Sequence, residues 1–137
     1  MIAIDTNVLV RVLTDDDQSP EQTQQARQLV QQAGSVFVPQ IVQVELVWVL
    51  ERAYELEKSQ IIFALQLLLD SPIYQLQHPT EFALALERFR HSNAGFADSL
   101  IATESIRQNT TLWTFDHKLS KQQGVKLLTQ QALTFIE

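Results

Sequence analysis

The stretch Met1-Ile2-Ala3-Ile4-Asp5-Thr6-Asn7 opens the chain, and its apolar residues lead into an acid, a hydroxyl and an amide. A short segment this apolar, with no polar alternation, predicts a strand of a parallel sheet that is covered on both faces. The carboxyl ends of strands in open α/β sheets form the crevice where ligands bind, so Asp5 is a candidate site residue. The alternative is that Asp5 caps the helix that follows, as Asp often does before an apolar-periodic run.

Length and composition narrow the class of protein. The 137 residues suffice for one domain with its own core, so we expect a single domain over residues 1–137. The chain has no cysteine, which excludes disulfides and thiolate metal sites and leaves oxygen or imidazole as metal ligands. No apolar run approaches the roughly 18 residues of a membrane span, and no basic segment precedes an apolar one as in a signal peptide. We therefore expect a cytoplasmic protein with no membrane partner.

The net charge of −6 argues against broad, sequence-blind attraction to nucleic acid, which normally depends on a basic stripe. It does not exclude an enzyme that acts on nucleic acid. Carboxylates gathered around cations raise the acidic count, while the cations reverse the local field.

Short strands alternate with helices along the whole chain. Turn residues support the boundaries: Ser19, Pro20 and Gln22 predict a capping box that begins a helix, Gly34 ends it, and Ser59 is expected to cap another. Strands are predicted near 1–4, 36–38, 73–76, 111–115 and 125–127, and helices near 8–13, 20–32, 40–57, 59–69, 79–91, 96–108 and after Thr129. This alternation is typical of a parallel α/β sandwich.

Glu45 is the most informative acid of the predicted helix over residues 40–57. An acid set in an apolar helix face must be paired or bound to a cation, because burying a lone carboxylate is very costly. The alternative is an internal salt bridge with Arg52, two turns further along the same face. The side chains one helical turn away on either side are all apolar: Ile41, Val42, Trp48 and Val49.

Asp98 lies in the first turn of the helix predicted from Phe96, among mostly apolar neighbours. The helix dipole favours an acid there, which is a structural explanation. The apolar neighbours instead indicate an inward-facing acid, and Ser99 would be able to hydrogen-bond a metal-bound water or a carboxylate.

Asp116 follows the predicted strand 111–115 as Asp5 follows the first strand, and it too has a structural alternative as a helix cap. Parallel strands deliver their carboxyl ends to one edge of a sheet, so we expect Asp5 and Asp116 to face the same crevice. Thr114, two residues earlier, would lie on the same side of its strand.

Two strand-end acids and two acids on apolar helix faces together predict a carboxylate pocket. Four such groups cannot remain ionised side by side without a cation. Hard oxygen ligands in a chain without cysteine favour Mg²⁺, with Mn²⁺ as a substitute. A site of this kind suits in-line displacement at phosphorus.

The segments that carry these acids resemble the PIN domain, specifically the VapC-type toxin ribonucleases of type II toxin–antitoxin systems. They occur in the family's order and spacing across essentially the entire chain. The matching segments are Asp5-Thr6-Asn7, Val44-Glu45-Leu46, Phe96-Ala97-Asp98-Ser99-Leu100-Ile101-Ala102 and Thr114-Phe115-Asp116.

This resemblance implies a three-layer α/β/α sandwich around a short parallel sheet and Mg²⁺-dependent endoribonuclease activity on RNA. It also implies an antitoxin partner and a homodimer. By carry-over from the family, the catalytic and metal-binding residues would be Asp5, Glu45 and Asp98, with Asp116 as the fourth acid. The supporting polar residues would be Thr6, Asn7, Ser99 and Thr114.

Two basic residues are candidates for substrate contact. Arg11 either reaches an RNA phosphate near Asp5 or pairs with the acidic run Asp15–Asp17. Lys118, together with Lys121, would form a basic rim beside Asp116.

Other functions remain as alternatives. A PIN fold that has lost catalysis would act as a binding module, and a PIN nuclease without an antitoxin would process RNA alone. A phosphatase of the haloacid dehalogenase type needs a second Asp two residues after the first, where this chain has Asn7. A Rossmann or P-loop protein needs a glycine-rich loop, and the chain holds only Gly34, Gly95 and Gly124.

Overall fold

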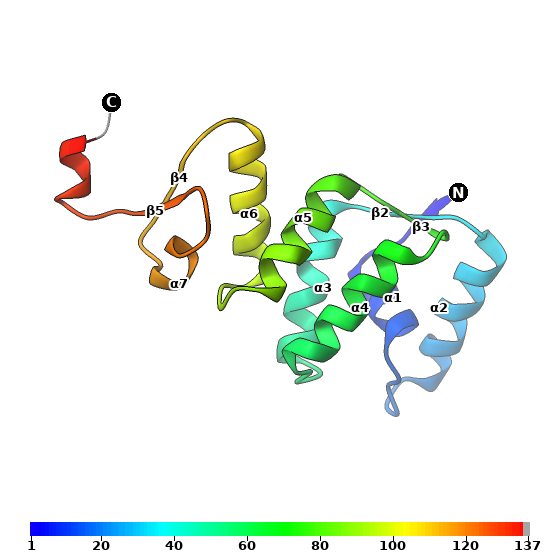
Figure 1. Ribbon diagram of the computed structural model, residues 1–137. Coiled ribbons are helices and arrows are strands. Elements are labelled where there is room, and N and C mark those ends of the chain that lie inside the picture. Colours follow the sequence, from blue (N-terminus) through cyan, green and yellow to red (C-terminus); the bar gives the residue numbers. More distant parts are fainter. Residues whose placement is uncertain (136–137) are drawn as a thin grey trace. The chain divides into compact units, whose positions relative to one another are not determined.

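A computed structural model describes residues 1–135 of the chain, which divide after Pro79 into two compact units (Figure 1). The single domain expected over residues 1–137 stays a prediction.

The first unit alternates short parallel strands with helices, as the sequence predicts (Figure 1). Its three strands pair in the order β1-β2-β3, and every pairing is parallel. Its elements are β1 (Ile2–Ala3), α1 (Thr6–Leu13), α2 (Pro20–Ala33), β2 (Val36–Val38), α3 (Gln40–Arg52), α4 (Lys58–Asp70) and β3 (Tyr74–Leu76).

The central strand of this sheet is buried, whereas the first strand is not fully covered. Val36 and Val38 of β2 have no exposed surface. In β1, Ala3 is exposed and Ile2 is only partly buried. The expectation that the first strand is covered on both faces is therefore wrong, since neither of its two side chains is fully buried. The strand also lies at an edge of its sheet. Ile4, just after the strand, is buried.

Helix boundaries confirm some of the predicted signals and correct others. Pro20 begins α2, and Gly34 ends it in the left-handed conformation with φ 71°. The capping box predicted at Ser19 is wrong, because the Ser19 side chain makes no capping hydrogen bond.

A capping box is present at the start of a different helix, α4, where Glu57 and Gln60 form it. Ser59 is therefore not the cap of α4. Helix α3 ends at Arg52 rather than at residue 57. Glu55 has a φ of 51°, and the Leu56 N–H donates to the Leu50 carbonyl at 3.0 Å. A hydrogen bond of this kind, from an N–H beyond the helix to a carbonyl of its last turn, is typical of helix C-termini.

The second unit carries two strands, β4 (Leu112–Thr114) and β5 (Val125–Leu127), which also pair in parallel. Its helices are α5 (Pro79–Arg90), α6 (Phe96–Arg107), the short α7 (His117–Ser120) and the 3₁₀ helix η1 (Ala132–Phe135). The Thr129 hydroxyl accepts a hydrogen bond from the Ala132 N–H at 3.0 Å, which confirms Thr129 as a cap. The strands of the described residues thus form two short parallel sheets, and the α/β class is confirmed.

Three phenylalanines pack together in the core of the second unit. Phe96 is 1% exposed, and its ring centroid lies 5.6 Å from that of Phe82 and 6.0 Å from that of Phe89. Tilted and edge-on contacts of this kind add to the stabilisation from burial. They hold the start of α6, where Asp98 lies, against α5. Among residues 1–135, no helix is both long and apolar enough to cross a membrane.

We predict that Phe96→Ala lowers the free energy of unfolding by about 3–5 kcal/mol, because it leaves a cavity in a close-packed core. Phe115→Ala is the matched control, since Phe115 is 77% exposed and its loss should change stability by no more than about 0.5 kcal/mol. Urea unfolding followed by circular dichroism measures both. Equal effects of the two substitutions would contradict this account of the core.

Candidate active site

Asp5 both follows β1 and caps α1. Its Oδ1 accepts a hydrogen bond from the Val8 N–H at 3.1 Å, so the capping role weighed from the sequence is confirmed. Its other carboxylate oxygen has no partner among the described residues. Asp5 and Asn7 also line a cavity of about 320 Å³ together with Arg11 and the facing side of α2. Capping therefore uses one oxygen of Asp5 and leaves the other for a ligand.

Glu45 lies beside the start of α1. The Thr6 hydroxyl donates to Glu45 Oε1 at 2.9 Å, which joins the first predicted motif to the second. The salt bridge with Arg52 considered from the sequence is absent from the ion pairs of the described residues. The Thr6 hydroxyl thus orients one oxygen of the Glu45 carboxylate.

The expectation that Glu45 is buried in an apolar face is wrong. Glu45 is exposed, and two of its apolar helical neighbours, Ile41 and Trp48, are 63% and 45% exposed. The helical periodicity correctly predicts which side chains surround Glu45. It does not predict whether another element covers that face, because the coverage depends on tertiary packing.

Asp98 lies half-buried in the first turn of α6. Burial raises the pKa of its carboxyl group above the ordinary value, and repulsion by the Asp116 carboxylate raises it further. Both causes disfavour the ionised form in the absence of a positive charge. The two acids of the second unit are therefore electrostatically coupled.

Asp116 is held by three hydrogen bonds in the turn between β4 and α7. Its Oδ1 accepts from the N–H groups of Lys118 at 2.8 Å and Leu119 at 3.1 Å. Its own N–H donates to the Thr114 hydroxyl at 3.0 Å. The capping alternative is confirmed here as well, and Thr114 supports the turn that places the Asp116 carboxylate.

The remaining sequence candidates have defined positions. Ser99 is fully buried, and its hydroxyl accepts from Gln122 Nε2 at 3.1 Å. Arg11 pairs with Asp16 at 2.9 Å and also donates to the Tyr54 hydroxyl at 2.7 Å, so of its two alternatives the structure shows the pairing with the acidic run. The Lys118 side chain is exposed.

The predicted acids differ from other acids in what surrounds them. Asp15 and Asp16 are neutralised by arginines. No ion pair of the described residues involves any of the four predicted site acids, which are Asp5, Glu45, Asp98 and Asp116. Carboxylate oxygens without a basic partner are the kind of ligand that a hard divalent cation prefers.

Each unit contributes two of these acids, linked through Thr6 in the first unit and by direct repulsion in the second. Within residues 1–135, no group of three or more acidic or histidine side chains is gathered closely enough to hold a metal ion. A shared four-carboxylate site stays a prediction.

The chain matches a known protein family over most of its length. The PIN domain model matches residues 2–125, and the chain belongs to the PIN domain family. The chain is also similar to a VapC ribonuclease of Aquifex aeolicus (strain VF5). The two are 27% identical over 101 residues, which cover 73% of this chain and 75% of that protein.

We predict that Asp98→Asn raises the melting temperature by about 1–3 °C at pH 7 without metal. Because the pKa of Asp98 is raised in the folded protein, its charged form opposes folding once the pH exceeds the ordinary carboxyl range. The gain should therefore shrink as the pH falls toward 3, where both folded and unfolded forms are protonated. Thermal melts in EDTA across this pH range measure the effect.

The matched control is Glu104→Gln, which removes an exposed acid from the same helix. It should leave the melting temperature nearly unchanged. A melting temperature of Asp98→Asn below that of the wild type at pH 7 would contradict the proposed electrostatic cost.

Proposed function

We propose that the protein is a Mg²⁺-dependent endoribonuclease in which Asp5, Glu45, Asp98 and Asp116 together hold the metal. The observation that carries this proposal is a set of four carboxylates without a basic partner, at the four motif positions of the PIN family. Membership of the family and similarity to a VapC ribonuclease support RNA as the substrate. Mn²⁺ would serve as a substitute for Mg²⁺.

A divalent cation bound by these acids would lower the pKa of a bound water and stabilise the leaving oxygen at phosphorus. The chain's own residues prepare the site. The α1 and α7 amides hold one oxygen of Asp5 and of Asp116, which fixes the direction of the other oxygen. Thr6 does the same for Glu45. By analogy with the family, cleavage leaves a 5′-phosphate and a 3′-hydroxyl.

The biological role we propose is that of the toxin of a toxin–antitoxin pair in the cytoplasm, with a protein antitoxin as its partner. A homodimer is supported by exposed apolar side chains on two helices of the first unit. These side chains are Ile41 (63% exposed) and Trp48 (45%) on α3, and Phe63 (73%) and Leu67 (47%) on α4. Exposed apolar side chains that form a contiguous patch mark protein–protein interfaces.

We predict that Asp5→Asn lowers RNA cleavage by at least about 100-fold while the fold is retained. Asn caps helices about as well as Asp, so only the charge of the metal ligand is lost. Cleavage of labelled structured RNAs in Mg²⁺, alongside a thermal melt, separates these two effects. Asp17→Asn is the matched control, since Asp17 is an exposed acid outside the four motifs.

Cleavage by Asp5→Asn at the wild-type rate would show that the assignment of Asp5 is wrong. If the wild-type protein binds RNA but gives no product at any Mg²⁺ or Mn²⁺ concentration, the protein is a binding module instead of a nuclease.

A further inference from the structure

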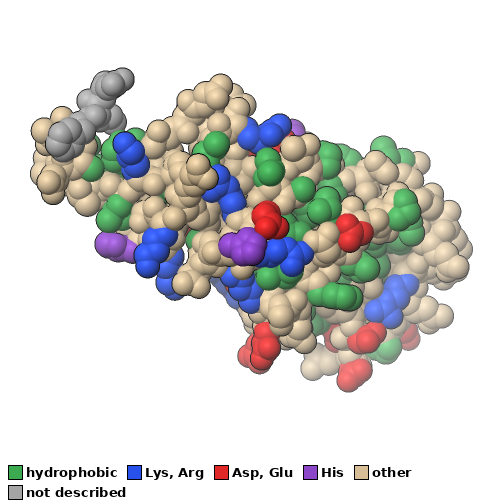
Figure 2. Space-filling view, in the orientation of Figure 1, with side chains coloured by type: hydrophobic (Ala, Val, Ile, Leu, Met, Phe, Trp, Pro, Cys, Tyr) green, Lys and Arg blue, Asp and Glu red, His purple; other side chains and the backbone are tan. Residues whose placement is uncertain are grey.

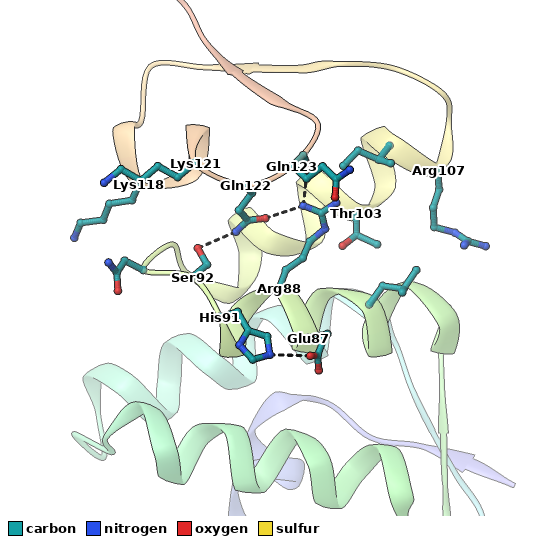
Figure 3. Close-up of a pocket in the computed structure, with 13 residues that line it drawn as sticks. Glu87, Arg88, His91, Ser92, Thr103, Arg107, Lys118, Lys121, Gln122 and Gln123 are labelled. Carbon is teal, nitrogen blue, oxygen red and sulfur yellow. Dashed lines mark hydrogen bonds and ion pairs between the residues drawn. The ribbon is translucent and has the colours of Figure 1, made fainter.

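The second unit contains a cavity of about 640 Å³ that the acidic motifs do not explain. Its walls are the C-terminal half of α5, the loop that follows it, the C-terminal half of α6, and the segment of α7 with the residues just after it (Figure 3). Four basic residues line this cavity: Arg88, Arg107, Lys118 and Lys121. The cavity therefore combines side chains from three consecutive helices and the segments next to them.

The charge of the cavity is opposite to that of the chain as a whole. The first unit has ten acids and four basic residues, whereas the second unit has six of each. Four of those six basic residues line the cavity, against one acid, Glu87. Lys and Arg side chains also cluster over the α6–α7 part of the face shown in Figure 2. Positive charge in this acidic protein is thus concentrated at one cavity.

Most of these cations have no carboxylate partner. Arg107 pairs with Glu81 at 3.3 Å. Within residues 1–135, no ion pair neutralises Arg88, Lys118 or Lys121. The cavity is therefore able to accept an anionic ligand without breaking an existing ion pair at these three positions.

Hydrogen bonds hold the Arg88 side chain in place in this cavity. From α5 it reaches across the cavity, and its Nη1 donates to Gln122 Oε1 and to the Gln123 carbonyl, both at 3.1 Å (Figure 3). These neutral acceptors orient the guanidinium group and leave its charge uncompensated. An arginine fixed in this way loses little side-chain entropy when it binds a phosphate.

Gln122 links the cavity to the candidate active site. Its Nε2 donates to the Ser92 hydroxyl at 3.0 Å and to the Ser99 hydroxyl at 3.1 Å. Ser99 directly follows Asp98, so a chain of hydrogen bonds joins Arg88 to the residue beside a proposed metal ligand. A ligand in the cavity would thereby be held in a fixed relation to Asp98.

We propose that this cavity binds backbone phosphates of the RNA strand away from the cleaved bond, with Arg88, Lys118 and Lys121 as the contacts. The inference rests on the proposed nuclease function and adds a second point of substrate attachment. Cations that arise from separate helices around one large cavity suit several phosphates of a strand better than one small anion. Ser92, Asn93 and Thr103 supply neutral polar groups along the same walls.

We predict that Lys118→Gln combined with Lys121→Gln weakens binding of single-stranded RNA about tenfold and reduces the salt dependence of binding. Each lost phosphate contact should lower the slope of log K against log salt by about 0.7, or about 1.4 for both. Both lysines are exposed, so the fold should not change. Fluorescence anisotropy of a labelled RNA with the Asp98→Asn background in EDTA measures binding without cleavage.

The matched control is the pair Lys58→Gln and Lys126→Gln, which removes the other two lysines of the chain and the same net charge. The control should keep the slope of the Asp98→Asn background. Equal slope losses in the two double variants would overturn the proposal, because binding would then follow net charge alone.

A second probe distinguishes RNA from a small anion. The RNA assignment is overturned if inorganic phosphate at millimolar concentration binds in the cavity of the wild type while the lysine variants leave the salt dependence of RNA binding unchanged. Failure of the wild type to bind RNA in EDTA would also overturn it. Cleavage in Mg²⁺ is measured in a separate assay. A failure of the proposed RNA contacts can therefore be told apart from a failure of the proposed nuclease function.

Discussion

Carboxylates that lie close together repel one another unless a positive charge compensates them. The candidate site depends on whether a basic side chain or a bound cation supplies that charge. Some acids of the chain are compensated by an arginine, as Asp16 is by Arg11. Asp98 and Asp116 are not, and their repulsion contributes to the raised pKa of Asp98. Leaving such groups unpaired costs stability, and this cost is typical of a site that serves a ligand.

The choice between helix cap and metal ligand, which the sequence leaves open for two acids, turns out not to be exclusive. Asp5 and Asp116 each use one oxygen on helix amides and keep the other one free. Thr6 hydrogen-bonds the Glu45 carboxylate and Thr114 accepts from the Asp116 N–H, while the supporting roles of both residues at the site stay a prediction. The exposure of Glu45 could not be predicted, because helical periodicity identifies a face but not what covers it.

The fold class and most element positions could be predicted, because apolar runs alternate with strong breakers such as Pro20 and Gly34. Two capping predictions, at Ser19 and at Ser59, were wrong, because capping depends on local backbone geometry. The cationic cavity could be predicted only in part, because the sequence indicated Lys118 and Lys121 as a basic rim beside Asp116 but gave no sign of Arg88. Arg88 and Lys118 lie on different helices with no shared period, and only packing brings them to one cavity. Overall charge, at −6, indicated the opposite.

The proposed function depends on one divalent cation that the four carboxylates share. Amide NMR spectra of the isotope-labelled, RNA-free protein during Mn²⁺ addition test it most directly, because Mn²⁺ broadens only nearby signals. The account predicts that the amide signals of Asp5, Glu45, Asp98 and Asp116 broaden together at the same substoichiometric Mn²⁺ concentration. Broadening of only one pair, or of none of the four, would contradict it.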